Sequence, residues 1–355
     1  MSTFFTESDP EQADDGGSRP SATGPSTRRR RRARGLVVVL VGLLAVVLVA
    51  VAAGASYVAT VSHSVSENLR RADELPPDLP TGPGQAPRPT RAAAAGDAVN
   101  YVLLGSDSRT SQASQGRSDV LMVLHLAGDR RSAALISFPR DLYVSIPGHG
   151  KDKINAAYAL GGPSLTIRTL EGLLGTRMDH VALVDFAGFI DLTEQLGGVT
   201  VDNPHPSVSQ GYAFPRGRIT VRGPEALAYV REREQLPRGD LDRAERQRLV
   251  AQAVLAKGLA RENLLNPVAF NRFAGGLARS VTVDRDLTMD ELRRTALSVR
   301  FRPGDIESLQ APVERFGTTP SGQSVDLVDT VQLAELAQAL REDRVSAYAE
   351  EHPGG

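Results

Sequence analysis

Charged side chains stand in pairs at the ends of two apolar runs that the sequence predicts as strands. Asp107 and Arg109 closely follow the first run, and Arg117 and Asp119 directly precede the second. Ligands bind in the loops at strand ends of α/β sheets, and two close carboxylates repel each other unless a cation lies between them. If the two strands are neighbours, Asp107 and Asp119 are candidate ligands of Mg²⁺, or alternatively Mn²⁺, that also binds substrate phosphate. The alternative is that each aspartate only caps a turn.

A third pair, Arg140 and Asp141, follows the apolar run 133–138, which also has strand length. Its position at the end of a strand matches that of the first two pairs. The alternative interpretation is an ion pair on the protein surface.

The densest set of charged residues surrounds two predicted helices. Arg231 and Arg233 stand at the end of the first, and Arg243, Arg246 and Gln247 share a face near the start of the second. A helix N-terminus attracts anions, and guanidinium groups bind phosphate in a bidentate manner. The pattern therefore predicts a phosphate or pyrophosphate clamp, with a solvated, charged helix start as the alternative.

The elements that must position these residues alternate between strands and helices, which favours an α/β domain with helices covering a central sheet. Glycine pairs and prolines divide them, and Asp242 with Glu245 forms a capping-box pattern. The predicted strands are 101–104, 120–126, 133–138 and 199–201. One helix is predicted to begin at 163, and four others are predicted at 186–196, 224–231, 242–259 and 326–341.

The N-terminal third of the chain has a different composition. Residues 1–34 are polar and end in clustered arginines, and they predict a disordered cytoplasmic segment. Residues 35–61 carry no charge, and the 26 residues of 36–61 span roughly 39 Å as a helix, enough to cross a bilayer. A cleaved signal peptide is the alternative, but the apolar run exceeds the usual signal core. The arginines place the N-terminus in the cytoplasm and the remainder outside.

The sequence then predicts a flexible proline- and alanine-rich linker at 62–95, a catalytic domain at 96–345 and a tail at 346–355. The chain has 355 residues and no cysteine, which excludes disulfides, thiolate metal sites and cysteine nucleophiles. With a net charge of -1, and with its basic run explained by membrane topology, it is not expected to bind nucleic acid.

Taken in order, these motifs resemble the LytR-CpsA-Psr domain over about residues 98–260. The resemblance rests on Gly-Ser-Asp-Ser-Arg at 105–109, Phe-Pro-Arg-Asp at 138–141 and Lys-Ile-Asn-Ala-Ala-Tyr at 153–158. It also includes the segments 117–119, 161–162, 184–186, 197–199, 223–227, 231–233, 239–243 and 246–247.

The resemblance implies an α-β-α sandwich around a central mixed sheet, with a long apolar lipid pocket, preceded by one transmembrane helix. It also implies a Mg²⁺-dependent phosphotransferase of the cell membrane that moves a glycopolymer from a polyprenyl pyrophosphate to peptidoglycan. Asp107 and Asp119 would bind the metal, and Asp119, Arg140 and Asp240 would be catalytic, with Asp119 the first candidate for the general base and Asp240 the second. The implied pyrophosphate contacts are Arg109, Arg117, Arg140, Arg231, Arg233, Arg243 and Gln247.

Two other functions remain compatible with the sequence. The chain could be a membrane-anchored, Mg²⁺-dependent polyprenyl-pyrophosphate hydrolase, or a non-catalytic anchor that binds wall polymer. The polymer is also open. The basic residues are almost all arginine, which is typical of a GC-rich genome and makes actinobacterial arabinogalactan one candidate beside teichoic-type and capsular polymers.

Overall fold

The computed structural model describes residues 70–353, apart from 83, 107–117, 259–274, 276–277, 289–290, 292–293, 296–297 and 303–304. Within this part of the chain, no helix is both long and apolar enough to cross a membrane. The predicted cytoplasmic segment at 1–34 and the predicted transmembrane helix at 35–61 lie outside the described residues.

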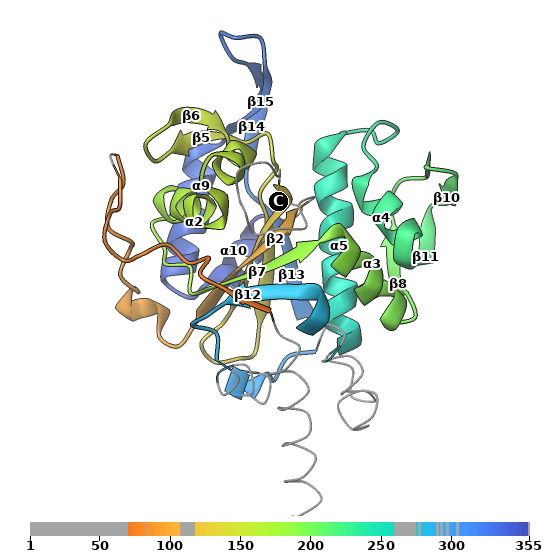
Figure 1. Cartoon of the computed structure of the whole chain (residues 1–355), viewed down its shortest axis with the longest axis horizontal. Helices are drawn as coiled ribbons and strands as arrows, with labels where there is room; N and C mark the ends of the chain where they lie inside the picture. Colours follow the sequence, from red (N-terminus) through yellow and green to blue (C-terminus); the bar gives the residue numbers. More distant parts are fainter. Residues whose placement is uncertain are drawn as a thin grey trace, which may run out of the picture. The chain divides into compact units, whose positions relative to one another are not determined.

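A seven-stranded mixed sheet runs through the centre of the molecule (Figure 1). Three neighbouring pairs are parallel, namely β1–β12, β7–β2 and β4–β13, and the other three are antiparallel. In sheet order the strands are β1 (Arg70–Ala72), β12 (Val281–Asp284), β7 (His180–Asp185), β2 (Val99–Ser106), β3 (Ser118–Leu126), β4 (Ala133–Ser137) and β13 (Ile306–Gln310).

Helices cover both faces of this sheet (Figure 1). One layer holds α2 (Ile154–Leu174), α9 (Thr330–Arg341) and α10 (Val345–Glu351). The other holds α3 (Phe186–Gln195), α4 (Gly223–Arg231) and α5 (Asp240–Gly258). The predicted mixed α/β sandwich is therefore confirmed.

The central strands are apolar on both faces because both faces are covered. In β3, Leu121 and Val123 join the core beneath α2 and α9, whereas Met122 and Leu126 join the core beneath α5. The continuous apolar runs that predicted strands at 120–126 and 133–138 follow from this double burial.

Short hairpins and a 3₁₀ turn complete the domain. Two of the hairpins, β5–β6 and β14–β15, lie beside the turn after β4, and a parallel bridge joins Leu142 to Asp326. These elements are η1 (Ala93–Ala95), β5 (Tyr143–Ile146), β6 (Gly150–Lys153), β8 (Val199–Asn203), β9 (Ser207–Ser209), β10 (Tyr212–Phe214), β11 (Gly217–Val221), β14 (Val313–Thr318) and β15 (Ser324–Val328).

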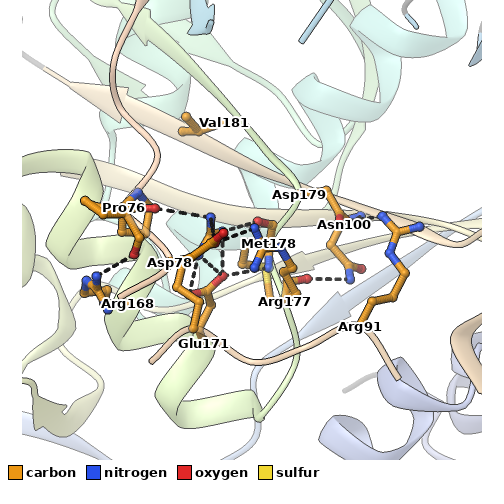
Figure 2. A network of polar contacts seen from close by, with 12 residues as sticks. Pro76, Asp78, Arg91, Asn100, Arg168, Glu171, Arg177, Met178, Asp179 and Val181 are labelled. Atoms are coloured by element: carbon orange, nitrogen blue, oxygen red, sulfur yellow. Dashed lines mark hydrogen bonds and ion pairs between the residues drawn. The ribbon is translucent and has the colours of Figure 1, made fainter. Parts of the chain in front are cut away.

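The chain before the sheet is packed against the domain, so the prediction of a flexible linker is wrong for the described residues between 70 and 95. β1 pairs with β12, and the buried Arg88 donates to Glu171 and to the carbonyl of Met178. Arg168 also donates to the carbonyl of Pro77. Figure 2 shows the surrounding network, including Arg168, Glu171 and Met178. Proline-rich composition indicated a spacer, but buried arginines hold this segment in place.

Three predicted element boundaries are also wrong. The helix expected from Pro163 begins at Ile154 and continues across a kink at Gly161 and Gly162, where Gly162 adopts a φ of 64°. The closing helix expected from 326 begins at Thr330, because residues 324–328 pair with β14 instead. Residues 346–351, expected as a tail, form most of α10, whose Tyr348 packs into the main core.

Candidate active site

Six residues predicted for the site surround one cavity of about 140 Å³. Its lining is Asp119, Arg140, Val230, Arg231, Arg233, Arg243 and Gln247. Asp107, Arg109 and Arg117 lie outside the described residues. The expectation that the two flanking strands are neighbours is confirmed, since Gly105 of β2 pairs with Val120 of β3.

Sheet topology brings Asp119 and Arg140 to the same edge. Asp119 is the second residue of β3, and Arg140 lies three residues after β4. Because β3 and β4 are antiparallel, with Met122 opposite Ser137, the start of one lies beside the end of the other. The turn that carries Arg140 is closed by a hydrogen bond from the Leu142 amide to the Pro139 carbonyl, 3.0 Å long.

Arg140 connects three carboxylates. Its Nε lies 2.9 Å from Oδ2 of Asp240 and 3.7 Å from Oδ2 of Asp141, and its Nη1 lies 3.2 Å from Oδ1 of Asp119. Lys153, at the end of β6, neutralises Asp141 from the other side at 2.8 Å. Burial lowers the pKa of Arg140, but the attraction of Asp240, Asp141 and Asp119 outweighs it and leaves the pKa above its ordinary value.

The end of α4 and the start of α5 supply the remaining cations. Arg231 stacks over the Phe186 ring at 4.8 Å, and Arg233 and Arg243 lie 3.7 and 3.4 Å from Oδ1 of Asp240. Gly239, with a φ of 55°, ends the turn between the helices, and Asp240 is the first residue of α5. Helix α5 thus begins two residues before the predicted cap.

The polar atoms here are incompletely paired. Oδ1 of Asp240 and Nε of Arg243 are buried and have no hydrogen-bond partner among the described residues. Burial raises the pKa of Asp240, but Arg243, a hydrogen bond with Asp141 and Arg140 outweigh it and hold the pKa below its ordinary value. Burial is also the main reason why the pKa of Arg243 is lowered. A desolvated cation with a free donor is suited to binding an anion.

Gln247 and Arg246 differ in what they contact. Nε2 of Gln247 donates to the carbonyls of Val230 and Asp119, and so joins α5 to α4 and β3 beside the cavity. Arg246, expected on the same binding face, is instead buried, with its guanidinium 4.4 Å from the Tyr229 ring. It donates to the carbonyl of His205, and its part in the predicted clamp is wrong because it packs in the core between α5 and β10.

Asp326 is a site neighbour that the sequence did not reveal. It lies on β15, and its backbone amide donates to the Asp141 carbonyl at 2.9 Å. No local motif marks it, because the contact joins positions far apart in the chain and the sequence pattern predicted a helix there.

A second group of possible metal ligands lies near the start of α5. His205, Asp242 and Glu245 each offer a ligand atom, all within 4.8 Å of one another. However, Arg238 lies 2.6 Å from Asp242 and 2.8 Å from Glu245. These carboxylates already hold a cation, the guanidinium group, and the cluster is explained as an ion-pair network.

The comparisons with known proteins agree with this fold. The LytR_cpsA_psr family model matches residues 59–342, and the chain belongs to this family. A relative from Enterococcus faecalis (strain ATCC 700802 / V583), named polyisoprenyl-teichoic acid--peptidoglycan teichoic acid transferase TagU, is 35% identical over 244 residues. That match covers 68% of this chain and 78% of the relative.

Solved structures of similar fold include Bacillus subtilis TagV, with a TM-score of 0.62 and 27% identity, covering 70% of this chain and 98% of that one. A structure described as TagT bound to LI-WTA has a TM-score of 0.57 and 27% identity, covering 76% of this chain and 99% of that one.

Proposed function

We propose that this protein is a membrane-anchored phosphotransferase. It transfers a glycopolymer, together with its phosphate, from a polyprenyl pyrophosphate carrier to a sugar hydroxyl of peptidoglycan. The observation that carries this proposal is the convergence of four arginines on one cavity beside Asp119: Arg140, Arg231, Arg233 and Arg243. The transferase names of the relatives support the same class of reaction.

The arginines suit a donor with two adjacent phosphates. Arg140 and Arg243 come from different elements and both contact the carboxylate of Asp240, and Nε of Arg243 is a buried donor without a hydrogen-bond partner in the described structure. Arg231 is held by its contact with Phe186, and in the described part of the chain no carboxylate lies within 4.0 Å of its guanidinium group. Planar guanidinium groups can each bind two phosphate oxygens, so they fix the orientation of the pyrophosphate as well as its charge.

A divalent cation fits the acidic side of the cavity. Asp119 lines the cavity, and its carboxylate makes a single contact, at 3.2 Å, with Arg140 in the described structure. Hard carboxylate oxygens beside a phosphate site are the donors that Mg²⁺ prefers, with Mn²⁺ as an alternative. Asp119 and, from the end of β2, Asp107 would hold the ion, which would supply further neutralisation of phosphate charge.

The general base follows from this division of the carboxylates. If Asp119 binds the cation, Asp240 is the carboxylate that contacts three of the cavity arginines, whereas Asp141 contacts one and is paired with Lys153. The acceptor oxygen forms a bond to phosphorus, the bond to the bridging oxygen breaks, and polyprenyl phosphate leaves with the electron pair. The acceptor proton passes to Asp240. Arg140 and Arg243 stabilise the negative charge on the phosphoryl group in flight.

The membrane features complete the proposal. A helix at 35–61 anchors the chain, the basic segment 1–34 stays in the cytoplasm, and the catalytic domain lies outside the cell membrane. An apolar pocket in the domain receives the polyprenyl tail. Protease added to cells whose outer layers are permeabilised should digest the domain and spare the N-terminal segment. Protection of the domain would overturn the orientation.

The test of function uses the full chain in nanodiscs with a polyprenyl-pyrophosphate-linked glycan, Mg²⁺, a peptidoglycan fragment and water enriched in ¹⁸O. Transfer to the acceptor yields a glycan–phosphate–acceptor product without ¹⁸O in its phosphate, and omission of the acceptor leaves only slow cleavage, because positioning favours the bound hydroxyl over water. Equally fast ¹⁸O-labelled cleavage with and without acceptor would show a hydrolase. Binding without any turnover would show a non-catalytic anchor.

A further inference from the structure

The start of α2 contributes no residue to the lining of the cavity, although the segment 153–158 carries part of the family resemblance. Its backbone nevertheless supports the turn that carries Arg140. Three consecutive carbonyls of that turn, from residue 140 to residue 142, each accept a hydrogen bond of 2.8 to 3.2 Å from a backbone amide of another element. The donors are Asn155 and Ile154 at the start of α2 and Asp326 on β15. The backbone of the turn is therefore fixed from two sides.

Lys153 connects the same helix start with a side chain of the turn. It is the last residue of β6 and directly precedes α2, so its backbone is held by the pairing of β6 with β5. Its Nζ lies 2.8 Å from Oδ1 of Asp141, and the two side chains are 22% and 20% exposed, so water screens this ion pair only in part. In the described part of the chain, the only other cation within 4.0 Å of Asp141 is Arg140, at 3.7 Å.

Asp141 and Asp240 approach the same atom of Arg140. Asp240 lies 2.9 Å from Nε and Asp141 lies 3.7 Å from it. Nε of an arginine carries a single hydrogen and makes one strong hydrogen bond, which here goes to Asp240. Nη1 is then directed to Asp119 at 3.2 Å, and Nη2 donates no hydrogen bond within the described part of the chain. Nη2 is thus available to a phosphate in the cavity.

We propose that Lys153 is a positioning residue for Arg140. By neutralising Asp141, it prevents this carboxylate from drawing the guanidinium group away from Asp240 and the cavity. Without the ammonium group, Asp141 would be a partly buried anion whose nearest cation is Arg140, and the guanidinium group would turn toward it. The expected effect on rate rests on the proposed transferase function, whereas the position of Arg140 can be determined without any substrate.

Two other roles for Lys153 lead to different expectations. Its ammonium group could contact the donor phosphate directly, or the residue could only hold β6 against the turn. In both cases, a second substitution at Asp141 would not restore what the loss of Lys153 removes. If Lys153 acts by neutralising Asp141, the removal of both charges should return Arg140 to its place. The double variant Lys153→Met/Asp141→Asn therefore separates these roles.

The first experiment needs no substrate. Crystal structures of the full chain, grown from a lipid phase, are determined for the wild type, Lys153→Met and Lys153→Met/Asp141→Asn. In Lys153→Met, we expect Nε of Arg140 to leave Asp240 and donate to Asp141, and in the double variant to donate to Asp240 again. An unchanged contact between Arg140 and Asp240 in Lys153→Met would overturn the proposal, even if the transfer assay itself yields no product.

The second experiment compares the transfer kinetics of the variants. Lys153→Met should lower kcat/KM at least about tenfold, since it displaces a charge-assisted contact with phosphate. Lys153→Met/Asp141→Asn should regain most of this loss, because no carboxylate then competes with Asp240. Lys153→Arg keeps the charge and should retain more activity than Lys153→Met, which also covers the case that the methionine variant fails to fold. The matched control is Lys151→Met, at an exposed position of the same strand, which should transfer at the wild-type rate.

The results that would contradict the proposal are distinct from a failure of the proposed function. A double variant as impaired as Lys153→Met would show that Lys153 acts other than through Asp141. Wild-type kinetics of Lys153→Met would likewise overturn its positioning role. An inactive wild type would instead contradict the transferase function, and the crystal structures would still test the position of Arg140.

Discussion

Two arginines show how differently this domain uses the same side chain. Arg88 is 3% exposed and places Nε and Nη2 on the single carboxylate of Glu171, itself 2% exposed, at 2.7 to 3.1 Å. Its remaining donors reach the carbonyls of Met178 and Pro76. Arg140 is 20% exposed, is shared among three carboxylates at 2.9 to 3.7 Å, and borders a cavity.

The two sites differ in how completely their polar atoms have hydrogen-bond partners, rather than in the number of charges. At Arg88 the buried anion is Glu171, the exposed Asp78 lies at 3.9 Å, and each guanidinium nitrogen has a hydrogen-bond partner. A buried ion pair satisfied in this way contributes to structure. Around Arg140, a cavity collects several guanidinium groups, and nearby oxygen and nitrogen atoms lack partners. Unsatisfied groups of this kind mark functional sites, where a ligand completes the pairing.

The largest effect should follow from breaking the satisfied pair. Arg88→Ala leaves the Glu171 carboxylate buried without its cation, which should lower the free energy of unfolding by about 3 to 5 kcal/mol. Chemical denaturation of the full chain in detergent measures it. Transfer per folded molecule should be unchanged.

The double variant Arg88→Met/Glu171→Met is the matched control, because it removes both charges and keeps apolar volume. It should recover most of the lost stability. If the double variant is as unstable as Arg88→Ala, the burial of an unpaired charge is not the cause of the loss.

At the cavity around Arg140, substitutions should mainly reduce activity rather than stability. Asp119→Asn should lower the transfer rate by about 10²- to 10³-fold, since it weakens the cation site at the phosphate. Its unfolding midpoint should stay within a few degrees of the wild type. The exposed Asp202→Asn serves as control in the same assay. Near wild-type turnover of Asp119→Asn would remove this carboxylate from the chemistry.

Arg140→Lys keeps the charge and changes only its geometry. An ammonium cannot span Asp119 and Asp240 while also binding phosphate in a bidentate manner, so kcat/KM should fall by about 10- to 100-fold. Steady-state kinetics at several donor concentrations will measure the loss. Full activity in the lysine variant would reduce Arg140 to a source of positive potential.

The smallest effect is a pH dependence of stability. The pKa of Asp326 is raised in the folded state to about 6, so between pH 4 and 6 the folded chain binds more protons than the unfolded chain. Its ionisation should therefore reduce stability as the pH rises through this range, by at most about 1.4 kcal/mol per pH unit. Relative to the wild type, Asp326→Asn should gain stability over the same range. A constant difference between the two proteins would argue against the raised pKa.

The sequence predicted the sandwich and most of the cavity because these depend on local pattern. Apolar runs of strand length and charged residues at their ends identified Asp119 and Arg140, and the end of α4 identified Arg231 and Arg233. Asp326 could not be found in this way, because only the pairing of β15 with the turn after β4 brings it to the site.

The structural role of Arg88 was not predicted, and Arg246 was wrongly assigned to the clamp, for a related reason. Each is one arginine among many in the sequence, and only tertiary burial separates them from solvated ones. The proline-rich composition around Arg88 indicated a linker, yet a buried partner on α2 overrides local propensity. Helical periodicity correctly predicted that Gln247 lies at the cavity. It could not show that Arg246, on the same predicted face, is buried against Tyr229.

The central claim is that the cavity around Arg140 binds the pyrophosphate of the donor, whereas the Arg88 network is structural. Calorimetric titration of the full chain in nanodiscs with a short-chain polyprenyl pyrophosphate and Mg²⁺ tests this directly. The double variant Arg88→Met/Glu171→Met should bind with wild-type affinity, and Arg140→Ala should bind at least about tenfold more weakly, since it removes a charge-assisted contact. Equal affinities of the wild type and Arg140→Ala would contradict the account.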